Sequence, residues 1–139
     1  MKGFIKAIAS ISGLVCAVAA GAAHATTVTV TIINHSADTI AWKTGTNGLP
    51  TVIGGGQTTS QTINFNKSGS TVRATYAKVN GQACTFVATH KLITSGSTLI
   101  PQFDKSATSS GTVSATCTAN LVDVKYVAPY NYTAKFEMY

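Results

Sequence analysis

Residues 71–90 read TVRATYAKVNGQACTFVATH, and this stretch decides the fold. Two runs in which apolar and polar residues alternate lie on either side of Asn80-Gly81. Alternation with a period of two is typical of a β-strand that buries one face. An Asn-Gly pair between two such runs is the strongest short-range signal for a β-hairpin. The stretch therefore predicts two antiparallel strands that share one buried face.

The length of the hairpin loop decides which side chains are buried. A two-residue loop would pair Val79 with Gln82 and would turn Arg73 toward the core. A three-residue loop, with Gly81 at positive φ, pairs Lys78 with Gln82 instead. A shift of one residue moves every side chain to the other face, so we predict the second register. The buried face then holds Val72, Ala74, Tyr76, Cys84, Phe86 and Ala88.

The same alternation recurs along the rest of the chain, and no segment shows a helical stripe of apolar residues. The extended segments that we predict outside the hairpin lie around residues 27–32, 39–42, 52–53, 62–65, 92–93, 98–100, 113–117, 122–126 and 130–138. Residues 104–111 are polar and predict a loop. With 139 residues, of which 10% are charged, the chain suits one domain. We therefore predict a single all-β domain, an antiparallel β-sandwich of the Ig-like or jelly-roll-like type.

The first 25 residues have the pattern of a secretory signal peptide. Lys2 and Lys6 precede an apolar stretch over residues 7–20, which ends at the small residues of Ala23-His24-Ala25. This apolar run is shorter than the roughly 20 residues that a membrane span requires. We predict cleavage after Ala25, so that residues 26–139 form the exported domain, which is secreted or periplasmic and has no transmembrane segment. Cleavage after Ala23 is the alternative.

Cysteine usage agrees with export. Cys16 lies in the predicted signal peptide, so the processed chain keeps only Cys84 and Cys117. Two cysteines in an exported domain most simply form one disulfide. A reactive thiol pair is the alternative, but the two residues lack Cys-x-x-Cys spacing. We therefore predict a Cys84–Cys117 disulfide.

Signals of catalysis are weak, and we predict that the protein is not an enzyme. The acidic residues of the processed chain are far apart in sequence, and we expect Asp123 and Glu137 on solvent-facing sides of strands. Only His35, in a predicted turn, and His90, near a strand end beside Phe86, could act as a base. The lysines are scattered without a basic run, which excludes a nucleic-acid partner.

A copper-binding alternative depends on the cleavage site. Cleavage after Ala23 would make His24 the amino terminus, where its amine and imidazole nitrogen together can chelate Cu(II). His35 or His90 would supply a third nitrogen. Cleavage after Ala25 removes His24, so the primary prediction includes no cofactor.

The remaining class of function is binding or assembly. The processed chain would begin and end with alternating strands, at residues 26–33 and 130–139. In architecture this resembles pilins that assemble by strand donation, which also combine a disulfide with a C-terminal strand ending near a Tyr. The resemblance implies a fibre subunit that self-associates through edge strands. The chain lacks the long donor extension of such pilins, so we expect both terminal strands to close the protein's own sandwich.

Aromatic residues near the C-terminus suggest where a partner could bind. Tyr130 and Tyr132 fall on the predicted inner face, as core residues, and Trp42 is also expected in the core. Tyr139 alone is expected to point outward, and its ring offers an apolar face with a polar tip. The sequence thus predicts an exported, non-enzymatic binding or structural protein, such as an adhesin, an inhibitor or a surface or periplasmic accessory protein, with a protein or surface ligand as its partner.

Overall fold

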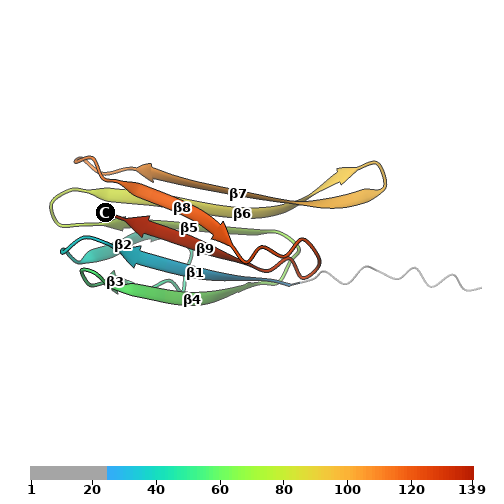
Figure 1. Cartoon of the computed structure of the whole chain (residues 1–139), viewed down its shortest axis with the longest axis horizontal. Helices are drawn as coiled ribbons and strands as arrows, with labels where there is room; N and C mark the ends of the chain where they lie inside the picture. The colour runs from blue at the N-terminus through green and yellow to red at the C-terminus, as the bar shows by residue number, and fades with distance from the viewer. Residues whose placement is uncertain (1–24) are drawn as a thin grey trace, which may run out of the picture.

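The computed structural model describes residues 25–139, which form two sheets packed face to face (Figure 1). The predicted signal peptide up to residue 24, including His24, lies outside the described residues. The strands are β1 (Thr26–Asn34), β2 (Ile40–Gly45), β3 (Val52–Ile53), β4 (Thr58–Phe65), β5 (Ser70–Ala77), β6 (Ala83–Ser95), β7 (Thr98–Ser109), β8 (Cys117–Val122) and β9 (Tyr132–Met138). The prediction of an all-β sandwich is confirmed. Within the described range no helix has the length and hydropathy to cross a membrane.

One sheet has four strands in the order β4-β1-β9-β8, and the other has five in the order β3-β2-β5-β6-β7. Strict alternation places one face of the inner strands β1 and β5 in the core. In β1 every second residue is buried, and β5 repeats that pattern. Because both sheets turn their apolar sides inward, the core lies between them. Phe86 of β6 and Phe136 of β9 meet there, stacked with ring centroids 4.9 Å apart.

The register of the β5–β6 hairpin agrees with the prediction. Tyr76 pairs with Cys84, and Ala74 pairs with Phe86. The N–H of Lys78 donates to the carbonyl of Gln82 at 2.8 Å, which closes a three-residue loop. Gly81 has φ of 92°, a conformation that glycine adopts without steric penalty. The six side chains predicted to share the buried face are all fully buried.

The expectation of purely antiparallel pairing is wrong for the two ends of the chain. β1 is antiparallel to β4 but parallel to β9, with Val30 opposite Ala134. A parallel pair needs a long connection, and here the intervening strands β2 to β8 provide it. Alternation is the same in parallel and antiparallel strands, so the sequence pattern carries no information on direction.

The boundaries of the later strands also differ from the prediction. Residues 104–109, which we expected in a polar loop, belong to β7 and pair with β6 as far as Cys84 opposite Ser109. β7 is an edge strand with most of its side chains exposed, so polar residues incur little penalty there. Residues 113–116 form no strand, because β8 begins only at Cys117, and beyond Val122 the chain becomes irregular.

The predicted disulfide between Cys84 and Cys117 is present. Cys84 is fully buried in β6 of the five-stranded sheet, whereas Cys117 begins β8 of the four-stranded sheet. The bond therefore connects the two layers. It lies near the end of the sandwich at which β9 and the chain terminate, since Cys117 pairs with Met138.

Candidate functional site

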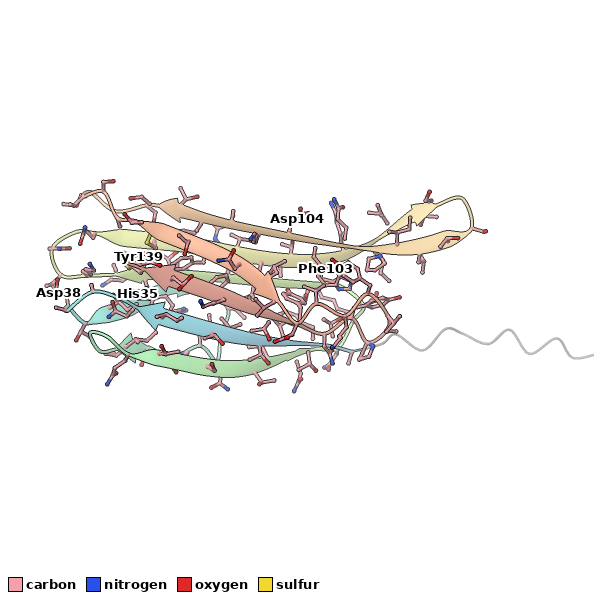
Figure 2. All side chains as sticks on the ribbon, in the orientation of Figure 1. His35, Asp38, Phe103, Asp104 and Tyr139 are labelled. Atoms are coloured by element: carbon pink, nitrogen blue, oxygen red, sulfur yellow. A yellow bond between two sulfur atoms is a disulfide. The ribbon has the colours of Figure 1, made fainter. Side chains whose placement is uncertain are left out.

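The structure does not bring the two described candidate metal-binding histidines together. His35 follows the end of β1, close to Tyr139, whereas His90 packs on Phe103, which lies toward the other end of the sandwich (Figure 2). Among residues 25–139 there is no cluster of three or more His, Cys, Asp or Glu side chains that could hold a metal ion. His35 and His90 therefore cannot serve one copper ion together.

His90 lies in the core rather than at the margin of a strand. It is 2% exposed and shares the inner face of β6 with Phe86, as predicted. Its ring stacks on Phe103 at 4.7 Å and lies 5.0 Å from the ring of Tyr130. Neither ring nitrogen has a hydrogen-bond partner among the described residues. Burial lowers the pKa of His90, because the charged imidazolium loses its water.

Tyr130 and Tyr132, which we expected on the inner face, both lie beside this aromatic group. Tyr132 is 2% exposed and its hydroxyl lies 3.0 Å from that of Ser70. Its ring meets Phe103 edge-on at 5.4 Å. Burial raises the pKa of Tyr132, and the hydrogen bond to Ser70 partly opposes that shift. Both tyrosines therefore act as packing residues and not as an exposed platform.

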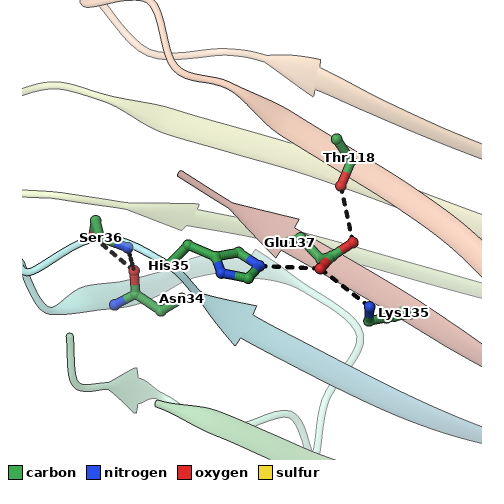
Figure 3. Close-up of polar contacts among 6 residues, drawn as sticks. All are labelled: Asn34, His35, Ser36, Thr118, Lys135 and Glu137. Atoms are coloured by element: carbon green, nitrogen blue, oxygen red, sulfur yellow. Dashed lines mark hydrogen bonds and ion pairs between the residues drawn. The ribbon is translucent and has the colours of Figure 1, made fainter. Parts of the chain in front are cut away.

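A polar cluster lies at the opposite end of the four-stranded sheet (Figure 3). His35 Nε2 lies 3.0 Å from Glu137 Oε1, and Lys135 Nζ lies 3.2 Å from the same oxygen. Thr118 donates its hydroxyl to Glu137 Oε2 at 3.3 Å. The hydrogen bond from His35 is the largest cause that lowers the pKa of Glu137, with Lys135 and Thr118 adding to it against the effect of burial. Glu137 is 8% exposed, so the expectation of a solvent-facing carboxylate is wrong: its three polar neighbours cover it.

This cluster has a histidine–carboxylate pair but no aligned nucleophile. Ser36 follows His35 directly, yet its hydroxyl donates to Asn34 Oδ1 at 2.7 Å. Asn34 is fully buried, and its side-chain oxygen also accepts the N–H of Ser36 at 3.1 Å. The hydroxyl thus belongs to a turn that ends β1, and it is not presented to His35.

Tyr139 is exposed, as predicted, and stacks on His35. The ring centroids are 4.3 Å apart and the planes differ by 8°. Tyr139 is 46% exposed, so one side of the stacked pair faces solvent. The pair forms a small aromatic and polar surface at the end of β9.

A larger apolar surface escaped the sequence analysis. Beyond the pair Ser70–His90, β6 has only β7 beside it, so residues 91–102 project as a two-stranded ribbon, which we call the arm. Figure 1 shows it extending past every other strand. Ile93, Leu99 and Ile100 on the arm are 41%, 57% and 43% exposed.

Val122, the last residue of β8, and the segment that follows it add to this surface. Val122, Tyr126 and Val127 are 41%, 67% and 72% exposed. The ring of Tyr126 meets Phe103, at the base of the arm, edge-on at 5.5 Å. We call the six exposed side chains of the arm and of this segment the apolar end. Its sequence signal is the stretch between Lys91 and Asp104, which contains no charged residue.

Comparison with known proteins adds no relative. The chain matches no model of a known protein family, and no curated protein matches its sequence.

Proposed function

We propose that the protein is an exported, non-enzymatic binding protein that docks onto a partner protein through its apolar end. The observation that carries the proposal is the arm, in which three large aliphatic side chains are more than 40% exposed. Ile93 pairs with Ile100 on one face of the arm, whereas Leu99 pairs with Thr94 and lies on the other face, so both faces expose apolar side chains. Exposed apolar surface bordered by polar residues is typical of an interaction site. This role fits an adhesin, an inhibitor or an accessory protein in the periplasm or outside the cell.

The shape of the arm favours a partner that covers its side chains. A two-stranded ribbon is only marginally stable by itself, because each of its faces lacks a packing layer. Pro101 lies in β7, an edge strand, where it removes a donor from the open edge. Addition of a further strand along that edge is therefore disfavoured. Contact through the faces of the arm remains, with Leu99 on one face and Ile93 and Ile100 on the other.

The pairing of the terminal strands argues against a pilin-like fibre subunit. β1 lies between β4 and β9, and β9 lies between β1 and β8. Neither strand has a free edge to which a donated strand could add. We do not favour the copper alternative, because His90 is enclosed among aromatic rings and His35 Nε2 contacts Glu137, while His24 lies outside the described residues.

Of the two sandwich types, we propose the Ig-like one. Nine strands divided into sheets of four and five match the variable-type immunoglobulin count, whereas a jelly roll has eight strands. The disulfide between the two sheets is a second point of similarity. The strand order is this protein's own, with the first and last strands, β1 and β9, both in the four-stranded sheet.

Site-specific photo-cross-linking tests the binding proposal. A photoreactive amino acid at position 99 should give an adduct with one partner protein in the native host. The same group at the exposed position Thr71, on the outer face of β5, should give none. The purified partner should then bind the Leu99→Asp variant at least tenfold more weakly, because a buried leucine contributes about 1.5–3 kcal/mol.

The matched control is Thr98→Asp, which adds the same charge to the arm without removing an apolar side chain. It should bind within about threefold of the wild type, since solvent screens an exposed charge. Equal adduct yields at positions 99 and 71 would refute the proposal. An adduct with a second copy of the chain would replace it with self-assembly.

A further inference from the structure

A small pocket lies beside Trp42, the only tryptophan in the sequence. It has a volume of about 160 Å³ and is lined by Trp42, Thr46, Asn47, Gly48, Leu49 and Thr51. All of these residues belong to β2 or to the loop that connects β2 with β3. Trp42 was expected in the core, but it is only partly buried and packs against the margin of the core. One side of its ring is therefore available to the pocket.

The loop that forms the pocket is held firmly against β5. The N–H of Thr46 donates to the carbonyl of Arg73 at 2.7 Å, and the N–H of Arg73 donates to Thr46 Oγ1 at 3.0 Å. At Gly45 the chain approaches β5 so closely that a Cβ would lie 2.1 Å from the carbonyl oxygen of Arg73. Leu49 is 7% exposed and anchors the middle of the loop in the core.

The end of the loop is fixed as well. The hydroxyl of Tyr76 donates to the carbonyl of Pro50 at 2.7 Å, and the N–H of Trp42 donates to the carbonyl of Thr51 at 2.8 Å. Bonds at both ends and an apolar anchor in the middle make the loop a preformed structure. A preformed site loses less entropy when a ligand binds than a flexible loop does.

The groups around the pocket are aromatic and neutral. The indole ring of Trp42 offers a flat apolar surface, while Thr46, Asn47 and Thr51 offer hydroxyl and amide groups. No charged side chain lines the pocket. Trp42 Nε1 is buried and has no acceptor among the described residues. Because that nitrogen is closed to solvent, a ligand in the pocket meets the face of the indole ring and not its N–H.

We propose that this pocket binds a neutral saccharide, with one pyranose ring against Trp42. A sugar combines an apolar face of C–H groups with hydroxyls around its rim, which matches an aromatic ring surrounded by neutral polar groups. The volume of about 160 Å³ is below the roughly 300–1,000 Å³ of pockets for drug-sized ligands, so a single ring enters. The proposal is independent of the apolar end and of any partner protein there.

Fluorescence provides a direct test, because Trp42 is the only tryptophan in the chain. The purified protein is titrated with glucose, galactose, mannose, N-acetylglucosamine and their disaccharides. At least one of these neutral sugars should change the emission of Trp42 in a saturable manner. Saturation-transfer NMR should show the same sugar in contact with the protein. Glucuronate, the charged counterpart of glucose, should bind more weakly than the neutral sugars.

The variants separate binding from folding. Asn47 is exposed, so Asn47→Ala should keep the fold and weaken binding about three- to tenfold through loss of a hydrogen bond. Asn66→Ala, in the exposed loop between β4 and β5, is the matched control and should bind as the wild type does. The proposal is overturned if no sugar changes the emission, if glucuronate binds best, or if Asn47→Ala and Asn66→Ala bind alike.

Discussion

Replacing His90 with leucine should remove a specific part of the protein's sensitivity to acid. The imidazole is 2% exposed, stacks on Phe103, and has two nitrogens without partners. The rings in contact with His90 are those of Phe103 and Tyr130, and neither carries a carboxylate that could stabilise an imidazolium. Asp104 is adjacent to Phe103 in β7, but it pairs with Thr89 on the outer face.

The size of the effect follows from linkage. Burial lowers the pKa of His90 below its ordinary value of 6.5, so the unfolded chain binds a proton more readily than the folded one. The free energy of unfolding therefore decreases as the pH falls below 6.5, by at most about 1.4 kcal/mol for each pH unit. Leucine has a similar volume and no proton to bind. The variant should therefore not show this decrease.

At neutral pH the same substitution has two opposing effects. It removes two unpartnered polar atoms from the core, which is favourable by about 1–3 kcal/mol for each group. It also removes the ring stacking with Phe103, which contributes about 0.5–1.5 kcal/mol. We expect the variant at neutral pH to be at least as stable as the wild type.

Urea unfolding followed by Trp42 fluorescence measures both effects. Wild type and His90→Leu are compared at about pH 7.5 and about pH 5.5, a window that spans the ordinary imidazole pKa. Glu137, with its lowered pKa, does not titrate in this window. The control variant His35→Gln, at the polar cluster, keeps His90. Its free energy of unfolding should therefore decrease between the two pH values as that of the wild type does. Equal decreases in stability for wild type and His90→Leu would refute the argument.

Three further predictions concern stability. Replacing Cys84 and Cys117 with alanine opens a loop with a sequence separation of 33 and should lower the free energy of unfolding by about 4 kcal/mol, measured by urea titration. A loss below about 1 kcal/mol would contradict the entropic argument. Gly45→Ala, which places a Cβ 2.1 Å from the Arg73 carbonyl oxygen at φ of 136°, should cost more than about 2 kcal/mol by thermal unfolding. Contact with His35 lowers the pKa of Glu137, so its carboxylate stabilises the folded protein above pH 4.5. Glu137→Gln should therefore lower the free energy of unfolding above pH 4.5 and should lose less of it on acidification than the wild type does. An acid-unfolding curve parallel to that of the wild type would disprove this.

The hairpin over residues 71–90 could be predicted in detail because three signals agree there. The alternation defines one apolar face, Asn80-Gly81 defines the turn, and Arg73 excludes the competing register. The structure has that register, with Tyr76 opposite Cys84. Where one face of a strand must be buried, alternation fixes the pairing register, because a shift of one residue would expose the apolar side chains.

Other features could not be predicted because local pattern does not encode them. The partner and direction of β9 depend on which strand lies beside it, and its alternation fits a parallel or an antiparallel neighbour equally. The polar residues 104–109 resemble a loop, yet an edge strand tolerates them because one side faces solvent. The arm is exposed because β5 begins only at Ser70, opposite His90, and the sequence of the arm does not contain that information.

For the candidate sites, the sequence predicts the exposure of single residues better than it predicts which residues lie beside them. Tyr139 was expected to be exposed, and it is. His35 was expected in a turn, but its contact with Glu137 joins residues 102 positions apart, which no local pattern shows. The apolar end combines the arm with a segment after β8, so it too is assembled only by the fold.

The position of the terminal strands relates the fold to the predicted export. β1, the first strand, has β9, the last, as one of its two neighbours, so the four-stranded sheet cannot be completed until residue 138 is available. Pairing between the two ends of a chain closes a very long loop, and folds dominated by such pairing form slowly. A chain that enters a secretion channel from its N-terminus is thus unable to complete this sheet before its last strand has been synthesised. If the chain is exported as the sequence predicts, the disulfide between β6 and β8 would form after transfer to an oxidising compartment, where it would connect the two sheets.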